Sequence, residues 1–241
     1  MTTILRAVIE ATGLSRRKTF AAIREGRVSL DGVSVLDPSR PYEGGVLTLD
    51  GAALTAPATA KTYLLMHKPP GFITTTADEQ GRRTVLDLVP KALRAPGLHP
   101  VGRLDRDTTG LLVLTNDGDL TQRLSHPSNE VEKEYWAAID APVTEELQAS
   151  LRGGVEIDGK LRRPLRVRRL PPETGFDVAI TIREGRKRQV RRMFVSIGVN
   201  VIKLRRMREG VLDLGSLAEG AVRELTADEV ALIRATTYLT P

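Results

Sequence analysis

The feature that most constrains this chain is a charged segment that leads directly into an apolar one. Residues 102–110 carry basic and acidic side chains between two glycines, and the apolar run Leu111-Leu112-Val113-Leu114 follows at once. A short apolar run bounded by turn residues predicts a buried strand. The same charged string is also typical of a solvated turn, so the segment by itself allows both interpretations. If it is functional, the strand would hold Asp105 rigidly at its entrance.

The pattern of elements beyond residue 60 predicts an α+β domain with a mixed or antiparallel sheet and helices packed on it. Apolar stretches of strand length interleave with amphipathic stretches of helix length. The predicted strands are 63–67, 111–115, 134–139, 165–170, 177–182 and 199–205. The predicted helices are 118–125, 143–152, 187–197 and 227–236, the last beginning with a capping box of Thr226 and Glu229.

A separate small unit is predicted before residue 60. Residues 4–26 show the apolar spacing of two short helices, the second capped by Ser15, and an Asp-Gly turn at 31–32 predicts a hairpin. Residues 51–60 are small and uncharged, which is typical of a linker. We therefore predict two domains, residues 1–59 and residues 60–241.

The charge of the chain favours a polyanionic partner. The formal net charge is +6, and its distribution is more informative than the sum. Residues 182–208 contain ten Lys or Arg and one acid, and residues 160–169 contain six Lys or Arg and no acid. Clusters of like charge repel one another unless an anion binds to them, so contacts with RNA or DNA phosphates are the favoured explanation.

Several classes of protein fit the composition poorly. The chain has no cysteine and three histidines at unrelated positions, so disulfides and zinc centres are not expected. No apolar stretch approaches the ~20 residues of a membrane span, and no signal peptide is recognisable at the N-terminus. We expect a soluble, cytoplasmic, monomeric protein without a metal or cofactor.

Four segments, in order, resemble the pseudouridine synthases that modify ribosomal RNA, in the RsuA/RluB-type branch of that family. The resemblance covers nearly the whole chain, and it also extends to the first unit, which is similar to the alpha-L RNA-binding module of a ribosomal protein. The segments that carry it are Lys68-Pro69-Pro70-Gly71, Gly102 to Gly118, Lys133-Glu134-Tyr135 and Glu184 to Met193.

The resemblance implies roles for four residues. Asp105 corresponds to the catalytic aspartate, which acts on the sugar as a nucleophile or by proton abstraction. Tyr135 corresponds to the tyrosine that stacks on the target base and is proposed to remove its C5 proton. Arg191 corresponds to the basic residue that pairs with the catalytic aspartate. Arg103 corresponds to the side chain that enters the helix stack when the base is flipped out.

Further basic residues are predicted to contact RNA. Cations in the first turn of a helix oppose its macrodipole, so the basic residues that follow Ser15 are better explained by phosphate binding than by helix stability. The basic residues around the start of the helix predicted over 187–197 and the lysine of the Lys-Pro-Pro-Gly turn are expected to lie along the RNA path. The predicted RNA-binding residues, besides Arg103, are Arg16, Arg17, Lys18, Lys68, Arg186, Lys187 and Arg188.

The predicted function is the conversion of a uridine of ribosomal RNA to pseudouridine. Large-subunit RNA is favoured over small-subunit RNA, and the substrate is either free RNA or a pre-ribosomal particle. The main alternative is a non-catalytic RNA-binding protein of ribosome assembly. A metal-dependent nuclease built on Asp105, Asp107 and Asp119 is a further alternative. A glycoside hydrolase fits poorly, because no second carboxylate stands out and aromatic residues make up only 4% of the chain.

Overall fold

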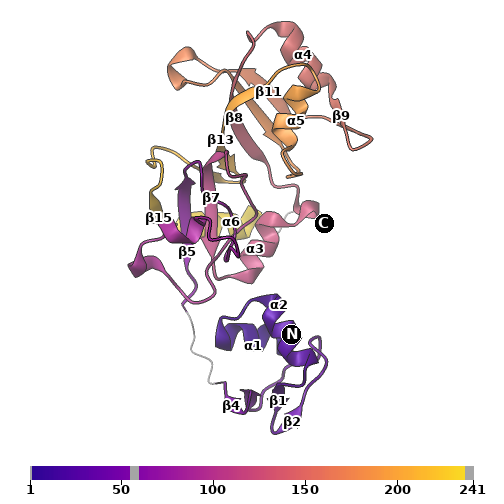
Figure 1. The fold of residues 1–241 in the computed structure, drawn as a ribbon, viewed down its shortest axis with the longest axis vertical. Helices are drawn as coiled ribbons and strands as arrows, with labels where there is room; N and C mark the ends of the chain where they lie inside the picture. Colours follow the sequence, from indigo (N-terminus) through magenta and orange to yellow (C-terminus); the bar gives the residue numbers. More distant parts are fainter. Residues whose placement is uncertain (1, 55–59, 237–241) are drawn as a thin grey trace. The chain divides into compact units, whose positions relative to one another are not determined.

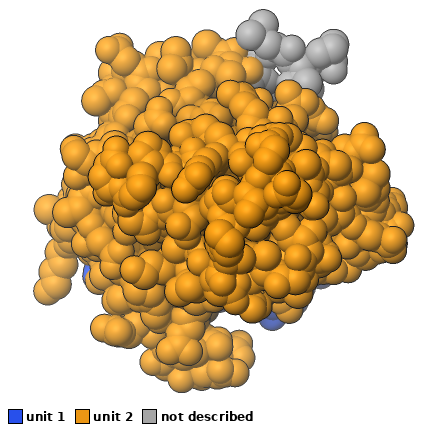
Figure 2. Space-filling model, turned by 90° about the horizontal axis from the view of Figure 1, so that it is seen from above, with its two compact units in different colours: residues 1–61, 94–98 blue, residues 62–93, 99–241 orange. Residues whose placement is uncertain are grey.

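The computed structural model describes residues 2–54 and 60–236 and divides the chain into two compact units (Figure 1). One comprises residues 1–61 with 94–98, and the other residues 62–93 with 99–241. The second unit forms one continuous body in the space-filling view (Figure 2). Among the described residues, no helix combines the length and the apolar character that crossing a membrane requires.

The first unit packs two helices on a small sheet. Helices α1 (Ile4–Thr12) and α2 (Arg16–Arg24) begin at Thr3 and Ser15, whose hydroxyls accept backbone hydrogen bonds as N-caps, so the predicted cap at Ser15 is confirmed. Buried apolar residues of both helices meet those of the sheet. The strands run in the order β2-β1-β3-β4 and comprise β1 (Val28–Leu30), β2 (Val33–Ser34), β3 (Leu47–Leu49) and β4 (Ala52–Ala53).

Strand β4 corrects the predicted start of the linker. The sequence predicts a linker from residue 51, but Ala52 and Ala53 pair with β3 through Thr48 and Leu49. A two-residue strand of alanines has neither the alternation nor the β-branched residues that mark strands in a sequence. The middle of the predicted linker, residues 55–59, lies outside the described residues.

The second unit is built on a nine-stranded mixed sheet, which confirms the α+β prediction. Its main path runs β11-β12-β8-β13-β7-β5-β15, with β14 paired to β13 and β6 to β7. The strands on this sheet are β5 (Tyr63–Lys68), β6 (His99–Pro100), β7 (Thr109–Thr115), β8 (Lys133–Ile139), β11 (Arg166–Arg169), β12 (Val178–Ile182), β13 (Val201–Glu209), β14 (Leu212–Asp213) and β15 (Val222–Glu224).

One parallel pairing joins the two halves of this sheet. Strands β13 and β7 run parallel, with Arg205 opposite Thr109 and Arg206 opposite Gly110, and the other pairings are antiparallel. Because β7 begins immediately after the charged segment, that segment lies at the junction of the halves (Figure 1). The sheet topology therefore places Asp105 between them.

Helices cover each half of the sheet. Helices α3 (Gly118–Ser125) and α6 (Ala227–Thr236) contribute Leu120, Leu124 and Ile233 to the core over β5 and β7. Helices α4 (Glu145–Gly153) and α5 (Gln189–Val195) lie with the other half, beside the hairpin of β9 (Val155–Ile157) and β10 (Lys160–Arg162) (Figure 1). The short 3-10 helices are η1 (Val85–Leu88), η2 (Lys91–Leu93), η3 (Pro127–Asn129) and η4 (Pro172–Thr174).

The capping box before α6 is confirmed. The Thr226 backbone N–H donates to Glu229 Oε2 at 2.8 Å, and the Glu229 N–H donates to Thr226 Oγ1 at 3.1 Å. Strands β6, β9, β10, β14 and β15 are absent from the prediction, because two or three residues are too few to establish a period.

Candidate active site

An open cleft of about 580 Å³ lies at the junction of the two halves of the sheet. Its wall combines the charged segment before β7, strands β8 and β13, and the basic loop before α5. Seven Lys or Arg side chains and three acids line it, so its field attracts anions. The charged residues are Arg103, Lys133, Arg183, Arg186, Lys187, Arg188, Arg206, Asp105, Glu184 and Glu209.

Asp105 lines the cleft from a loop that is held by backbone hydrogen bonds. Thr108 N donates to Asp105 O at 3.1 Å, and Gly71 N in the Lys-Pro-Pro-Gly turn donates to Arg106 O at 2.8 Å. The carboxylate of Asp105 is half-buried and makes no ion pair or hydrogen bond with the described residues. A rigid loop thus presents a carboxylate that is available to a ligand.

Lys68 supports this loop from beneath, which corrects its predicted role in RNA contact. It is 0% exposed, and its ammonium donates to Pro69 O at 3.0 Å, Arg106 O at 3.3 Å and Thr108 O at 2.9 Å. Burial lowers the pKa of Lys68 to about 8, against the opposing charges of Asp107 and Asp105. A buried ammonium that is used in this way cannot reach an RNA phosphate.

The glycine that ends the charged segment allows a close approach of two strands. Gly110 has φ +108°, and a Cβ there would collide with the backbone of Arg206 on β13. Any other residue would force apart the parallel pair that joins the halves of the sheet. Gly110 therefore fixes the distance between the Asp105 loop and β13.

Tyr135 lies in the same cleft on β8, opposite Arg206 of β13 and Ile180 of β12. It is 8% exposed. Burial raises the pKa of the Tyr135 phenol, and the charges of Glu209 and Asp105 act in the same direction, whereas Arg206 opposes them. The phenol is therefore neutral at pH 7 in the free protein.

Arg191 is 9% exposed, and it forms its ion pair with Asp107 instead of the expected Asp105. Its Nη2 lies 3.2 Å from Asp107 Oδ2, and its Nη1 donates to Val201 O at 2.7 Å. Burial lowers the pKa of Arg191, and the charges of Asp107 and Asp105 oppose this. The expected pairing is corrected: Arg191 forms its ion pair with Asp107, and it acts on Asp105 only through its charge.

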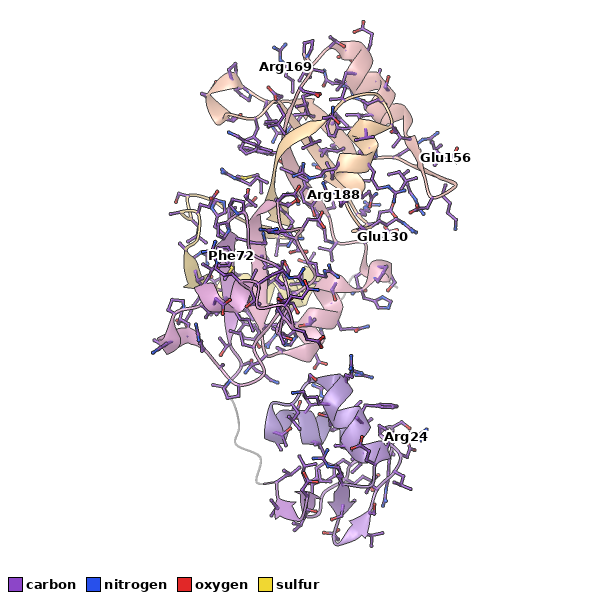
Figure 3. The ribbon with its side chains drawn as sticks, in the orientation of Figure 1. Arg24, Phe72, Glu130, Glu156, Arg169 and Arg188 are labelled. Atoms are coloured by element: carbon purple, nitrogen blue, oxygen red, sulfur yellow. The ribbon has the colours of Figure 1, made fainter. Side chains whose placement is uncertain are left out.

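The basic loop before α5 is arranged partly by its own acid. Glu184 accepts from Arg186 Nε at 3.0 Å and from Gln189 Nε2 at 3.1 Å. Arg188, labelled in Figure 3, lies 3.2 Å from Asp107. Lys187 is exposed and makes no ion pair within the described part of the chain, so its charge is available to a ligand.

The other predicted RNA contacts are exposed. Arg103 lines the cleft, and it has no ion-pair partner among residues 2–54 and 60–236. In the first unit, Arg16, Arg17 and Lys18 are exposed on the first turn of α2. Solvent-exposed cations of this kind can contact phosphates without leaving a partner unpaired.

Three of the six basic residues at 160–169 form ion pairs within the protein. Arg166 lies 2.9 Å from Glu132, and Arg168 lies 2.9 Å from Glu134. Arg162 lies 3.1 Å from Glu184. The segment 160–169 contains no acid, but the fold brings Glu132 and Glu134 within ion-pair distance of β11 across β12.

Sequence reasoning did not identify Lys133, Arg206 and Glu209 as residues of the cleft. The alternation of side chains along a strand could have indicated two of them. Arg206 lies two residues after buried Leu204 on β13, and Lys133 lies two residues before Tyr135 on β8, so each shares a face of the sheet with that residue. Glu209 breaks this period because a bulge lies between Arg206 and Arg208. Within the described residues, no group of three His, Asp or Glu side chains is arranged to hold a metal ion.

Comparisons with known proteins show the family to which this chain belongs. Residues 62–196 match the family described as RNA pseudouridylate synthase. The chain is 37% identical over 235 residues to the ribosomal large subunit pseudouridine synthase B of Bacillus subtilis, covering 96% of this chain and 95% of the relative. It is 38% identical over 233 residues to the protein of the same name from Vibrio cholerae, covering 94% and 72%.

A solved structure extends the likeness to the fold. A crystal structure of a pseudouridylate synthase matches with a TM-score of 0.68 and 31% sequence identity, covering 97% of this chain and 100% of the other. The match therefore extends over nearly the whole chain. Sequence, fold and cleft together place this chain in the RNA pseudouridylate synthase family.

Proposed function

We propose that this protein converts a uridine of large-subunit ribosomal RNA to pseudouridine, with Asp105 as the catalytic carboxylate. One observation carries the assignment: a carboxylate with no ion-pair or hydrogen-bond partner among the described residues and a buried tyrosine line one cationic cleft. The relatives named for the large ribosomal subunit support the choice of RNA.

The geometry suits the chemistry of this isomerisation. The N1–C1′ bond of uridine breaks, the base turns, and C5 bonds to C1′, while C5 loses a proton and N1 gains one. Asp105 acts at the sugar, either by attacking C1′ or by removing a sugar proton. We assign Tyr135 to packing against the base from β8, where its phenol first gives up its own proton and the resulting phenolate oxygen then accepts the proton from C5.

The surrounding cations would hold the RNA. Duplex RNA hides C1′ and C5, so the target nucleotide must leave the stack, at a cost of a few kcal/mol. The exposed Arg103 guanidinium is placed at the cleft to stack where the base was. Lys187, Arg186 and Arg188 lie around the cleft to bind phosphates, and the basic first turn of α2 adds contacts from the first unit.

We further propose that the two units are separate domains, with a boundary near residue 60, and that the protein acts as a cytoplasmic monomer. The compactness of each unit supports the first statement. The ribosomal substrates of the bacterial relatives support the cellular compartment. Sedimentation of the purified protein tests its oligomeric state.

Mapping pseudouridines in ribosomal RNA from cells with and without the gene tests the function. We expect one or a few sites of the large-subunit RNA to lose the modification and to regain it when the wild-type gene is restored, but not with Asp105→Asn. An unchanged pseudouridine map would contradict the proposal. Conversion by the purified protein of naked RNA or of pre-ribosomal particles then identifies the substrate form.

A further inference from the structure

A charged network lies beneath Tyr135, on the floor of the cleft. Arg206 on β13 is opposite Tyr135 on β8 and is 2% exposed. Its Nε donates to Leu111 O at 2.8 Å, in the strand that follows the Asp105 loop. Arg206 is therefore bonded to β7 and lies opposite β8 from its own position on β13.

Two further charged residues complete the network. Arg206 Nη2 lies 3.1 Å from Glu209 Oε2, and both side chains are 2% exposed. Glu209 Oε1 lies 3.9 Å from the ammonium of Lys133, which lies opposite it on β8. Burial lowers the pKa of Lys133, although the charge of Glu209 opposes this.

This network is poorly explained by stability. Burying an ion pair costs desolvation that offsets much of the Coulomb attraction, and apolar side chains of similar volume often stabilise a core as well or better. The geometry is also incomplete, because Arg206 Nη2 and Glu209 Oε2 have no hydrogen-bond partner among the described residues despite their short separation. Buried polar atoms without a hydrogen-bond partner are rare in native proteins, so those beside a ligand cleft are expected to have a functional role.

The groups that face Tyr135 indicate that reason. Arg206 favours the phenolate form of Tyr135 through its charge and its side-chain contact, whereas Glu209 and Asp105 disfavour it. The contact is mutual, because the charge of the phenolate also favours the charged form of Arg206. Arg206 is thus the group beside Tyr135 that offsets the burial of its phenol.

We propose that Arg206 is a positioning residue for Tyr135, held in place by Glu209 and Lys133. From the cleft floor its guanidinium orients the phenol hydroxyl and stabilises negative charge on it during proton transfer. This inference rests on the proposed function for its role in the reaction, but the placement of Arg206 opposite Tyr135 exists without RNA. It extends the site to a residue that lies 71 positions after Tyr135 in the sequence.

The contact is tested first without RNA, in the full-length protein. Difluorotyrosine is introduced at position 135, because its phenol is more acidic than that of tyrosine, and its ionisation is followed by fluorine NMR. We expect Arg206→Met to raise the pKa of this phenol by about one unit or more, and Glu209→Gln to lower it. The control is Arg205→Met, on the same strand beside Phe176, and it should leave the titration unchanged.

The functional role is tested by single-turnover conversion of a ribosomal RNA fragment. We expect Arg206→Met to lower the rate about tenfold to a hundredfold and to shift the alkaline limb of the pH–rate profile upward. Arg206→Lys keeps the charge and should restore part of the rate. RNA affinity should stay within about twofold, because the buried Arg206 offers no charge to a phosphate.

The outcomes separate this inference from the proposed function. If the wild-type protein converts no uridine, the function is wrong, yet the titration still decides whether Arg206 acts on Tyr135. Thermal unfolding will show whether Arg206→Met folds. If it does not, the direction in which Glu209→Gln changes the phenol pKa at position 135 decides whether the network acts on that phenol. The inference is overturned if the phenol titrates unchanged in the folded variants, or if Arg206→Met converts RNA at the parental rate.

Discussion

Arg191 binds Asp107, two residues beyond Asp105, with 3.2 Å between Nη2 and Oδ2. The same guanidinium donates to Val201 O at 2.7 Å, where β13 begins. Arg191 therefore ties α5, β13 and the Asp105 loop together. In this arrangement the loop positions Asp105 with no ion pair among the described residues, whereas Asp107 forms the ion pair with Arg191.

Asp105→Asn should abolish turnover and leave RNA affinity nearly unchanged. An amide of the same shape cannot act as the reacting carboxylate, but few phosphate contacts change. Both quantities are measured on one ribosomal RNA fragment, with the exposed Asp119→Asn as the control for losing one negative charge. Conversion at one tenth of the parental rate or faster would show that the role assigned to Asp105 is wrong.

Arg191→Lys should keep part of the activity, because it keeps the charge but loses the planar fork, and Arg191→Met should keep almost none. Met also leaves Val201 O without its donor, which costs about 1–3 kcal/mol of unfolding free energy. A double-mutant cycle with Asp107→Asn checks the pairing. Strictly additive losses would show that Arg191 does not act through Asp107.

Tyr135→Phe should bind RNA normally and stall after the glycosidic bond breaks, if the hydroxyl transfers the C5 proton. Phe keeps the stacking face, which is worth about 1–3 kcal/mol per base, whereas Tyr135→Ala removes it and should also weaken binding of the flipped base. Release of label from C5-tritiated uridine, compared with the parental protein, measures the step. If Tyr135→Phe converts RNA at the parental rate, the hydroxyl does not take part in the reaction and Tyr135 acts only by stacking on the base.

Lys68 should make the stability of the protein rise at alkaline pH. Its pKa is lowered to about 8 in the fold and is about 10.4 when unfolded, so the unfolded chain binds more protons between these values. At pH 7 the buried Lys68 is charged, and the desolvation of this charge lowers the free energy of unfolding. This loss is relieved as the pH rises above about 8, by at most about 3 kcal/mol.

Lys68→Met provides the reference for that measurement. Urea unfolding of both proteins at several pH values isolates the lysine from other titrating groups, and the wild type should gain stability relative to the variant from pH 8 to 10. The salt dependence of RNA binding should be the same for both proteins. A flatter salt slope for Lys68→Met would show that the buried ammonium contacts phosphate after all.

Replacing Arg16, Arg17 and Lys18 by Gln in the full-length protein should weaken RNA binding and flatten its salt dependence. The slope of log affinity against log salt should fall by about 0.7 to 0.9 for each phosphate that the variant no longer neutralises. Arg40→Gln, an exposed cation outside α2 in the same unit, serves as the control. An unchanged slope would mean that the basic turn of α2 does not touch RNA.

The sequence by itself determined the local structure of the site. The apolar run after the charged segment became the buried β7, Ser15 and Thr226 capped the helices they precede, and the in-phase residues of α5 became core. These features depend on neighbours within a few residues, which periodicity and capping chemistry describe. The order of motifs singled out Asp105 and Tyr135, and both residues line the same cleft.

Only the tertiary structure decided which charges meet. Lys68 reads as a surface cation but is buried under the Asp105 loop, and Arg191 reads as the partner of Asp105 but pairs with Asp107. Arg206 reaches Tyr135 only through the register of β13 and β8. Whether a charge is solvated, paired or buried depends on strands brought together from distant parts of the chain, and residue type and local spacing do not encode that information.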